Sequence, residues 1–155
     1  METQAKVIVM IGAPGSGKST FAKKLWHENP SFKYLSSDAL RAELGSGEED
    51  QSVTPLVFST LKRRLDHCLR RNESVIVDAT SMNAKDRKDY VNAAKQFNAS
   101  VVAYAFVCDK KTLIERNQKR GAGGGRNVPE FVIDKMLAKY QPPTTQEGFD
   151  EIHFV

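Results

Sequence analysis

The chain has 155 residues, of which 40% are hydrophobic and 27% are charged, and its formal net charge is +4. This composition is typical of one globular domain, so we expect a single domain over 1–155. No apolar run reaches the ~18 residues of a membrane-spanning helix, and the first residues lead almost directly into an apolar segment. These features exclude a membrane protein and predict a cytoplasmic one, with Cys68 and Cys108 as reduced thiols rather than metal ligands. The mild positive charge permits a polyanionic substrate without requiring one.

Apolar strand-like runs alternate with helix-like stretches along the whole chain. We expect strands at 6–11, 32–35, 74–77, 101–107 and 151–155. Helices are expected from the glycine-rich segment to about residue 26, then at 39–44, 54–71, 84–97, 109–119 and 130–140. Five strands alternating with helices predict an α/β fold, with a parallel sheet covered by helices on both faces.

One glycine-rich segment fits the phosphate-binding pattern G-x-x-x-x-G-K-[ST] at every required position. It follows the strand-like run 6–11 and precedes a helix, which is the context that this motif needs. The loop N–H groups and the helix N-terminus would face an anion, Lys18 would meet the β- and γ-phosphates, and the Ser19 hydroxyl would ligate Mg²⁺. We therefore predict ATP or GTP with Mg²⁺, bound by Gly12, Ala13, Pro14, Gly15, Ser16, Gly17, Lys18, Ser19 and Thr20.

Polar residues follow the second strand, at the sheet edge where ligands bind in such folds. Asp38 is a candidate to take the proton from an attacking hydroxyl, or to align that hydroxyl on the γ-phosphate. Arg41 is three residues further on, so on a helix it would face the same opening and could hold an anionic group of the acceptor. The alternative makes Asp38 only the N-cap of the helix at 39–44, and the two roles are compatible.

Asp78 directly follows the buried run 75–77, which is the position of the acidic partner that holds Mg²⁺ beside a phosphate loop. The alternative is a turn-forming aspartate at a strand end. Thr80 and Asn83 come next and would either bind substrate or shape the loop. Arg87, on the following helix, is either a substrate contact or a solvated surface charge.

Arg116 and Arg120 are four residues apart, so they share one face of a helix. A glycine-rich run at 121–125 and then Arg126 follow. This pattern predicts an arginine-bearing lid that closes over ATP and neutralises charge on the transferred phosphoryl group. A basic helix end beside a disordered loop is the alternative.

Two further stretches are open to more than one interpretation. The segment 50–54 could meet a substrate anion, although Thr54 as a plain helix cap before Pro55 explains it equally well. The basic run 62–64 could track a nucleic-acid backbone, but a solvated helix face is the better interpretation.

Together these motifs resemble the 5′-hydroxyl polynucleotide kinases of phages and of bacterial RNA-repair systems. The matching segments are 12–20, 35–38 with Arg41, 50–54, 75–80, Arg87 and 115–120. The resemblance implies an adenylate-kinase-like sheet of order 2-3-1-4-5 and transfer of the γ-phosphate of an NTP to a 5′-OH end of RNA or DNA. It also implies Asp38 as general base, Arg41 on the phosphate next to the acceptor nucleoside, and Arg116 and Arg120 on the NTP phosphates.

Three functions remain open on the sequence. The first is a polynucleotide 5′-kinase with RNA or DNA ends as its partners. The second is a kinase for another hydroxyl, such as a hydroxymethylated pyrimidine, a nucleoside or a sugar acid. The third is an ATP-binding switch protein, which would need neither a base candidate nor an arginine-bearing lid.

Overall fold

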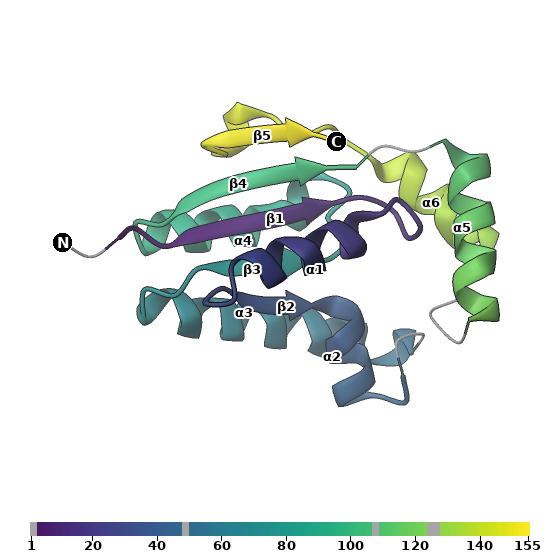
Figure 1. Cartoon of the computed structure of the whole chain (residues 1–155), viewed down its shortest axis with the longest axis horizontal. Helices are drawn as coiled ribbons and strands as arrows, with labels where there is room; N and C mark the ends of the chain where they lie inside the picture. The colour runs from purple at the N-terminus through teal and green to yellow at the C-terminus, as the bar shows by residue number, and fades with distance from the viewer. Residues whose placement is uncertain (1–2, 48–49, 107–108, 124–127) are drawn as a thin grey trace.

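A five-stranded parallel sheet forms the centre of the computed structural model, which describes residues 3–47, 50–106, 109–123 and 128–155 (Figure 1). Its strands lie in the order β2-β3-β1-β4-β5, and every neighbouring pair is parallel. The strands are β1 (Lys6–Ile11), β2 (Lys33–Ser36), β3 (Val75–Asp78), β4 (Ser100–Ala105) and β5 (Glu151–Phe154). The predicted fold class and strand order are therefore confirmed.

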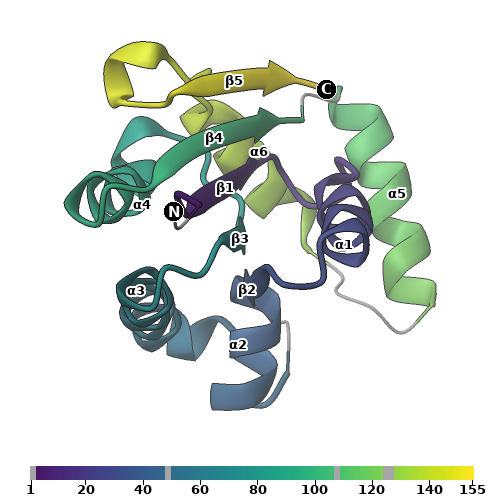
Figure 2. The same ribbon diagram turned by 60° about the vertical axis from the view of Figure 1, so that its left-hand side comes forward.

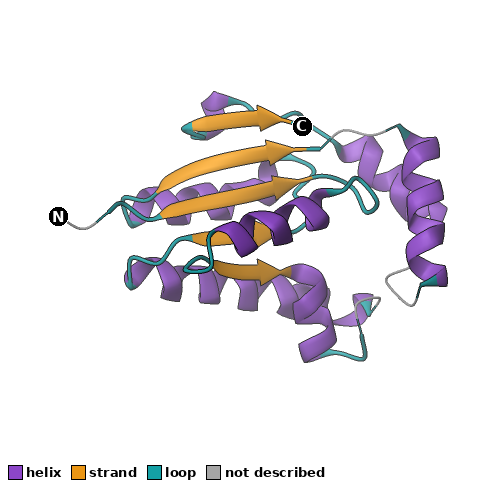
Figure 3. Ribbon diagram, in the orientation of Figure 1, coloured by secondary structure: helices purple, strands orange, loops and turns teal. Residues whose placement is uncertain are grey.

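Helices cover both faces of the sheet (Figures 1 and 3). Some lie on one face, others lie on the opposite face, and the rest stand at the carboxyl ends of the strands. They are, in that order, α1 (Lys18–Glu28), then α3 (Thr54–Arg70) with α4 (Ala84–Gln96), then α2 (Ser37–Leu44), α5 (Lys110–Ala122) and α6 (Glu130–Lys139). In the described part of the chain, no helix is both long and apolar enough to cross a membrane.

The central strands are apolar along their whole length because both of their faces are covered. All four residues of β3 are buried, as are Val7–Ile11 of β1. Side chains that alternate along these strands enter two separate clusters. Val7 and Val9 pack with α3 and α4, whereas Ile8 and Met10 pack with α1. This layering holds the carboxyl ends of β1 and β3 side by side.

The connections after β1 and β3 leave the sheet on opposite faces. The chain passes from β1 into α1 in front of the sheet and from β3 into α4 behind it (Figures 1 and 2). Because β1 and β3 are neighbours, their loops diverge and leave a crevice at the carboxyl edge, where open α/β sheets bind their ligands. The candidate residues for function are at this edge.

Several expected boundaries differ from those in the structure. Helix α2 begins at Ser37, and its N-cap is Ser36, whose hydroxyl accepts a hydrogen bond from the Ala39 N–H. The idea that Asp38 is the N-cap is therefore wrong, because Ser36 already performs that role. Thr54 is likewise the first residue of α3 and not its cap, and Leu56 faces solvent while Val57 is buried. Helix α5 runs to Ala122, into the glycine-rich run expected to end it.

Candidate active site

The loop between β1 and α1 has a backbone that needs glycine at two positions. Gly15 has φ of 86° and Gly17 has φ of 94°, in the left-handed region that other residues avoid. A Cβ at Gly15 would also lie 2.9 Å from the Leu113 carbonyl oxygen, so α5 packs directly against the loop. Gly17 is the N-cap of α1 and has no side chain to occupy the helix end, which leaves the first-turn N–H groups to an anion.

A pocket of about 910 Å³ opens in front of this loop at the carboxyl edge of the sheet. It receives residues from the phosphate loop, from α1, from β2 and α2, from the end of β3 and from α5. Those with polar side chains are Lys18, Ser19, Thr20, Lys23, Lys24, Tyr34, Ser36, Asp38, Asp78, Arg116 and Lys119. The fold thus brings together Lys18, Ser19, Asp38, Asp78 and Arg116, which are up to about 100 positions apart in the sequence.

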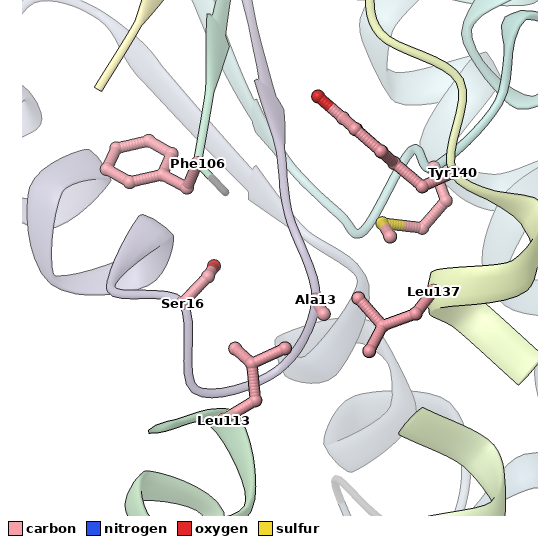
Figure 4. Close-up of a pocket in the computed structure, with 7 residues that line it drawn as sticks. Ala13, Ser16, Phe106, Leu113, Leu137 and Tyr140 are labelled. Atoms are coloured by element: carbon pink, nitrogen blue, oxygen red, sulfur yellow. The ribbon is translucent and has the colours of Figure 1, made fainter. Parts of the chain in front are cut away.

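A second cavity lies on the other side of the loop, between it and the α5–α6 pair (Figure 4). Its volume is about 20 Å³, which is room for a single water molecule. The lining is almost entirely apolar, with Ala13, Phe106, Leu113 and Leu137 around it. This cavity is too small for a nucleotide base, so the large pocket is the candidate site.

Lys18, Asp78 and Tyr34 form a buried polar cluster at the floor of the large pocket. The Lys18 ammonium lies 3.0 Å from Asp78 Oδ1, and the Tyr34 hydroxyl donates to Asp78 Oδ2. Burial raises the pKa of the Asp78 carboxyl, but Lys18, Tyr34 and Ser19 more than offset this and hold the pKa below its usual range. Burial and the Asp78 charge raise the Tyr34 pKa, so the phenol keeps its proton.

The cluster has the donor set that Mg²⁺ prefers beside phosphates. Mg²⁺ is usually held by one or two carboxylates together with substrate phosphates, rather than by a cage of protein ligands. Asp78 is ionised and at the pocket floor, and Ser19 is the first-turn hydroxyl next to it. Asp78 and Ser19 would hold the ion, which would neutralise charge on the phosphate oxygens.

Asp38 lies in the first turn of α2, with its carboxylate tied to Arg41. Arg41 Nη1 donates to Asp38 Oδ1 over 3.1 Å, and the Arg41 side chain is buried. Its Nε has no hydrogen-bond partner among the described residues, and its guanidinium lies 6.0 Å from the centre of the Phe58 ring. Asp38 lines the large pocket together with the phosphate loop.

Helix α5 places Arg116 over the phosphate loop, where Arg116 Nη1 donates to the Gly15 carbonyl oxygen over 3.2 Å. The Asn117 amide of α5 binds the segment just before α6, where its Oδ1 accepts from the Val128 N–H over 2.9 Å. Leu113 and Ile133 pack there with Ala13 of the loop. The lid prediction for Gly124, Gly125 and Arg126, and any role of Cys108 or the Arg120 side chain, lie outside the described residues.

The predicted residues on the loop after β3 and at the start of α4 serve the local structure. The Thr80 carbonyl oxygen accepts from the Gly12 N–H over 2.9 Å, which joins this loop to the phosphate loop. Asn83 is the N-cap of α4, with its side chain accepting from the Asp86 N–H. Arg87 is fully buried and does not line the pocket, so it is not a solvated surface charge.

Arg87 pairs instead with Glu147 near the C-terminal end of the chain. Its Nε and Nη2 each donate to a different Glu147 oxygen over 2.9 Å, and its Nη1 donates to the Ser81 carbonyl oxygen. Such a two-pronged arrangement uses most of the guanidinium donors. The structure therefore keeps Arg87 apart from the residues that meet in the pocket.

The two ambiguous stretches have clear partners in the structure. Asp50 accepts from the Ser52 hydroxyl and from the N–H groups of Ser46 and Ser52. These bonds shape the turn before α3 and lower the Asp50 pKa to about 2. In the basic run 62–64, Arg64 pairs with Glu43 of α2 at 2.6 Å. Lys62 and Arg63 are exposed on α3. Cys68 is a buried free thiol, as expected.

Sequence reasoning missed Tyr34, which lies in β2 two residues before Ser36. The available signal was its position: side chains two apart on a strand share a face, and Ser36 precedes the predicted site residue Asp38. It missed Lys23 and Lys119 as well, which line the pocket from α1 and α5. Their helices could be predicted, but not which helix faces the pocket.

Comparisons with known proteins identify the family of this chain. The family model AAA_33, described as an AAA domain, matches residues 7–143. A relative in Methanococcus maripaludis, L-seryl-tRNA(Sec) kinase, is 28% identical over 93% of this chain and 56% of its own length. The bifunctional polynucleotide phosphatase/kinase of Schizosaccharomyces pombe is 21% identical over 97% of this chain and 33% of its own.

Solved structures give the same result for the fold. A chain from the Pnkp1/Rnl/Hen1 RNA repair complex superposes with a TM-score of 0.78 at 25% identity, covering 97% of this chain and 48% of that one. The present chain thus spans about half, or less, of these proteins. With the family match covering most of the chain, we conclude that it belongs to the AAA_33 family and has the fold of a P-loop kinase.

Proposed function

We propose that this chain transfers the γ-phosphate of ATP, or of another NTP, to the 5′-OH end of RNA or DNA. The observation that carries the proposal is that Asp38 and the phosphate loop line the same pocket. An acceptor hydroxyl between them would meet a carboxylate on one side and a bound phosphate on the other. Phosphoryl transfer requires the protein to hold the attacking hydroxyl and the γ-phosphate in line with each other.

The residues predicted from the sequence have separate roles in this proposal. Lys18 and the first-turn N–H groups of α1 bind the phosphates, and Asp78 with Ser19 holds Mg²⁺. Arg116 lies over the loop and neutralises charge on the transferred group, with Arg120 as a second lid arginine. Asp38 is the general base, and Arg41 orients Asp38 and contacts the phosphate of the acceptor.

The names of relatives support this choice of acceptor without deciding it. The S. pombe relative is a polynucleotide kinase by name, and the superposed complex is an RNA repair complex. The M. maripaludis relative is named as a kinase for a seryl-tRNA, so a hydroxyl outside the 5′ end is our second candidate. A role in nucleic-acid repair and a cytoplasmic location are part of the first proposal.

The test is transfer of label from γ-labelled ATP, with Mg²⁺, to a single-stranded oligonucleotide with a free 5′-OH. The control is the same oligonucleotide with a 5′-phosphate. Label on the first alone supports the proposal. Label on neither, with nucleotide binding intact, contradicts it, and label on a seryl-tRNA in a parallel reaction supports the second candidate.

Asp38→Asn tests the general base. We expect transfer to fall by about 10²–10⁴-fold, because the amide cannot accept the proton, while ATP binding measured by calorimetry changes little. A variant that retains full transfer would remove Asp38 from this role.

Arg41→Ala tests the acceptor contact. Loss of the guanidinium should raise KM for acceptors that carry a phosphate by about tenfold, the usual effect of losing a charged hydrogen bond. KM for ATP should stay the same, and equal effects on both substrates would contradict the assignment.

A further inference from the structure

Tyr34 connects β2 to the carboxylate at the end of β3. In the register of these strands Tyr34 lies opposite Ile76 and Ser36 lies opposite Asp78. Tyr34 is thus two residues, or about 6.6 Å along the strand direction, before the position opposite Asp78. A tyrosine side chain is long enough to span this distance. Alternation places both side chains on the α1 face of the sheet, where the Tyr34 hydroxyl donates to Asp78 Oδ2.

The two oxygens of the Asp78 carboxylate have different donors. Oδ1 accepts from the Lys18 ammonium over 3.0 Å, and Oδ2 accepts from Tyr34. Both are hydrogen bonds to a charged group, which are stronger than bonds between neutral groups. The carboxylate therefore cannot rotate without breaking one of them.

Tyr34 is itself held in place. Its ring stacks on Trp26 of α1, with the ring centres 5.1 Å apart and the planes 18° from parallel. Trp26 Nε1 donates to the Phe32 carbonyl oxygen over 2.8 Å, which fixes the indole next to the start of β2. The hydroxyl thus approaches Asp78 from a rigid support.

We propose that Tyr34 is a positioning residue that fixes the rotation of the Asp78 carboxylate and so reserves Oδ1 for Lys18 and for Mg²⁺ of a bound nucleotide. Without the hydroxyl, both oxygens could turn toward the Lys18 ammonium. A two-oxygen pair would hold Lys18 more firmly and compete with the nucleotide phosphates for it. The inference rests on the Mg²⁺–nucleotide part of the proposed function and does not depend on the acceptor.

Tyr34→Phe removes the hydroxyl and keeps the ring that stacks on Trp26. Trp26 is the single tryptophan of the chain, so its fluorescence reports directly on this corner of the pocket. ADP binding is followed by this signal while the Mg²⁺ concentration is varied. We expect the Mg²⁺ concentration for half-maximal binding to rise about tenfold, the usual effect of losing one hydrogen bond to a charged group.

Tyr104→Phe is the matched control. Tyr104 is a partly buried tyrosine of β4 that packs in the same α1-side cluster, and its ring contacts Phe21 and His153. This variant should keep the Mg²⁺ dependence of the wild type. Melting temperatures of both variants establish that each is folded in the assay.

A double variant asks whether Tyr34 acts through Asp78. In an Asp78→Asn background, Tyr34→Phe should change the Mg²⁺ dependence no further, because the carboxylate that Tyr34 orients is gone. Independent, additive effects would overturn the inference. So would a Tyr34→Phe protein that matches the wild type in its Mg²⁺ requirement. Mg²⁺-independent ADP binding by the wild type would overturn it together with the metal assignment in the proposed function.

Discussion

Two ion pairs with buried cations lie near the carboxyl end of β3, and they differ in what surrounds them. Lys18 and Asp78 are 3.0 Å apart on the floor of the large pocket. Arg87 and Glu147 are 2.9 Å apart and away from that pocket, with Arg87 fully buried and Glu147 at 14% exposure. One pair faces a space that a ligand can enter, and the other is enclosed by protein.

The chemistry of the two cations matches their surroundings. Lysine carries a point charge on a flexible stem, so Lys18 can exchange Asp78 for a phosphate. The planar guanidinium of Arg87 is bound at three of its donors, to both Glu147 oxygens and to the Ser81 carbonyl, and has no such freedom. The comparison separates a pair at the pocket, which serves nucleotide binding in our proposal, from an enclosed pair, which joins the loop after β3 to the segment before β5.

The largest stability effect is expected at the enclosed pair. Arg87→Met leaves the Glu147 carboxylate without its cation, and breaking a buried pair in this way should lower the free energy of unfolding by about 3–5 kcal/mol. Chemical denaturation measures this change. Lys95→Met is the control, because its pair with Asp150 is half-exposed and should change stability by no more than about 0.5 kcal/mol. A stable Arg87→Met protein that has lost transfer would instead make Arg87 a substrate contact.

For the pair at the pocket the effect should be on transfer. Lys18→Met should lower the rate of label transfer by about 10²–10³-fold, as expected when one donor to the reacting oxygens is removed. Its unfolding free energy should fall less than that of Arg87→Met, because Tyr34 and Ser19 still donate to Asp78. Equal losses of stability in the two variants would remove the distinction between the pairs.

The smallest effect concerns acid stability. Burial raises the pKa of Glu147, but its bonds to Arg87 and to the Thr144 N–H lower the pKa below the ordinary 4.5. A carboxyl whose pKa is lower in the folded state stabilises the fold above its unfolded pKa, and this contribution is lost as the pH falls. Between pH 5 and 3 the wild type should therefore lose more stability than Glu147→Gln.

This difference is measured by denaturation at several pH values. Glu147→Gln should be less stable than the wild type at neutral pH, and the two should converge on acidification. Parallel curves would show that another carboxyl dominates the response in this range.

Features set by short stretches of chain could be predicted from the sequence. The phosphate loop was identified because its glycines, Lys18 and Ser19 occupy fixed positions between a strand and a helix. Asp38 and Asp78 were placed at the pocket because the carboxyl ends of parallel strands share one edge of the sheet. The cap-forming residues at 36–38 left the start of α2 ambiguous by two positions, since Ser36 and Asp38 are both good caps.

Partners that are far apart in the sequence could not be predicted. Arg87 was predicted to be a surface or substrate residue, and no acidic residue lies three or four positions from it on the helix. Its partner, Glu147, is 60 positions away. The position of Tyr34 in β2 could have marked it as facing the pocket, but its partner Asp78 could not be predicted, since Asp78 is on a neighbouring strand 44 positions away.

The sequence by itself determined the phosphate loop, the alternation of strands and helices and the acidic residues at strand ends, because these depend on local spacing and on the geometry common to parallel sheets. Only the tertiary structure decided which buried ion pair faces the pocket and which is enclosed by protein. Packing between segments that are distant in the sequence determines this difference.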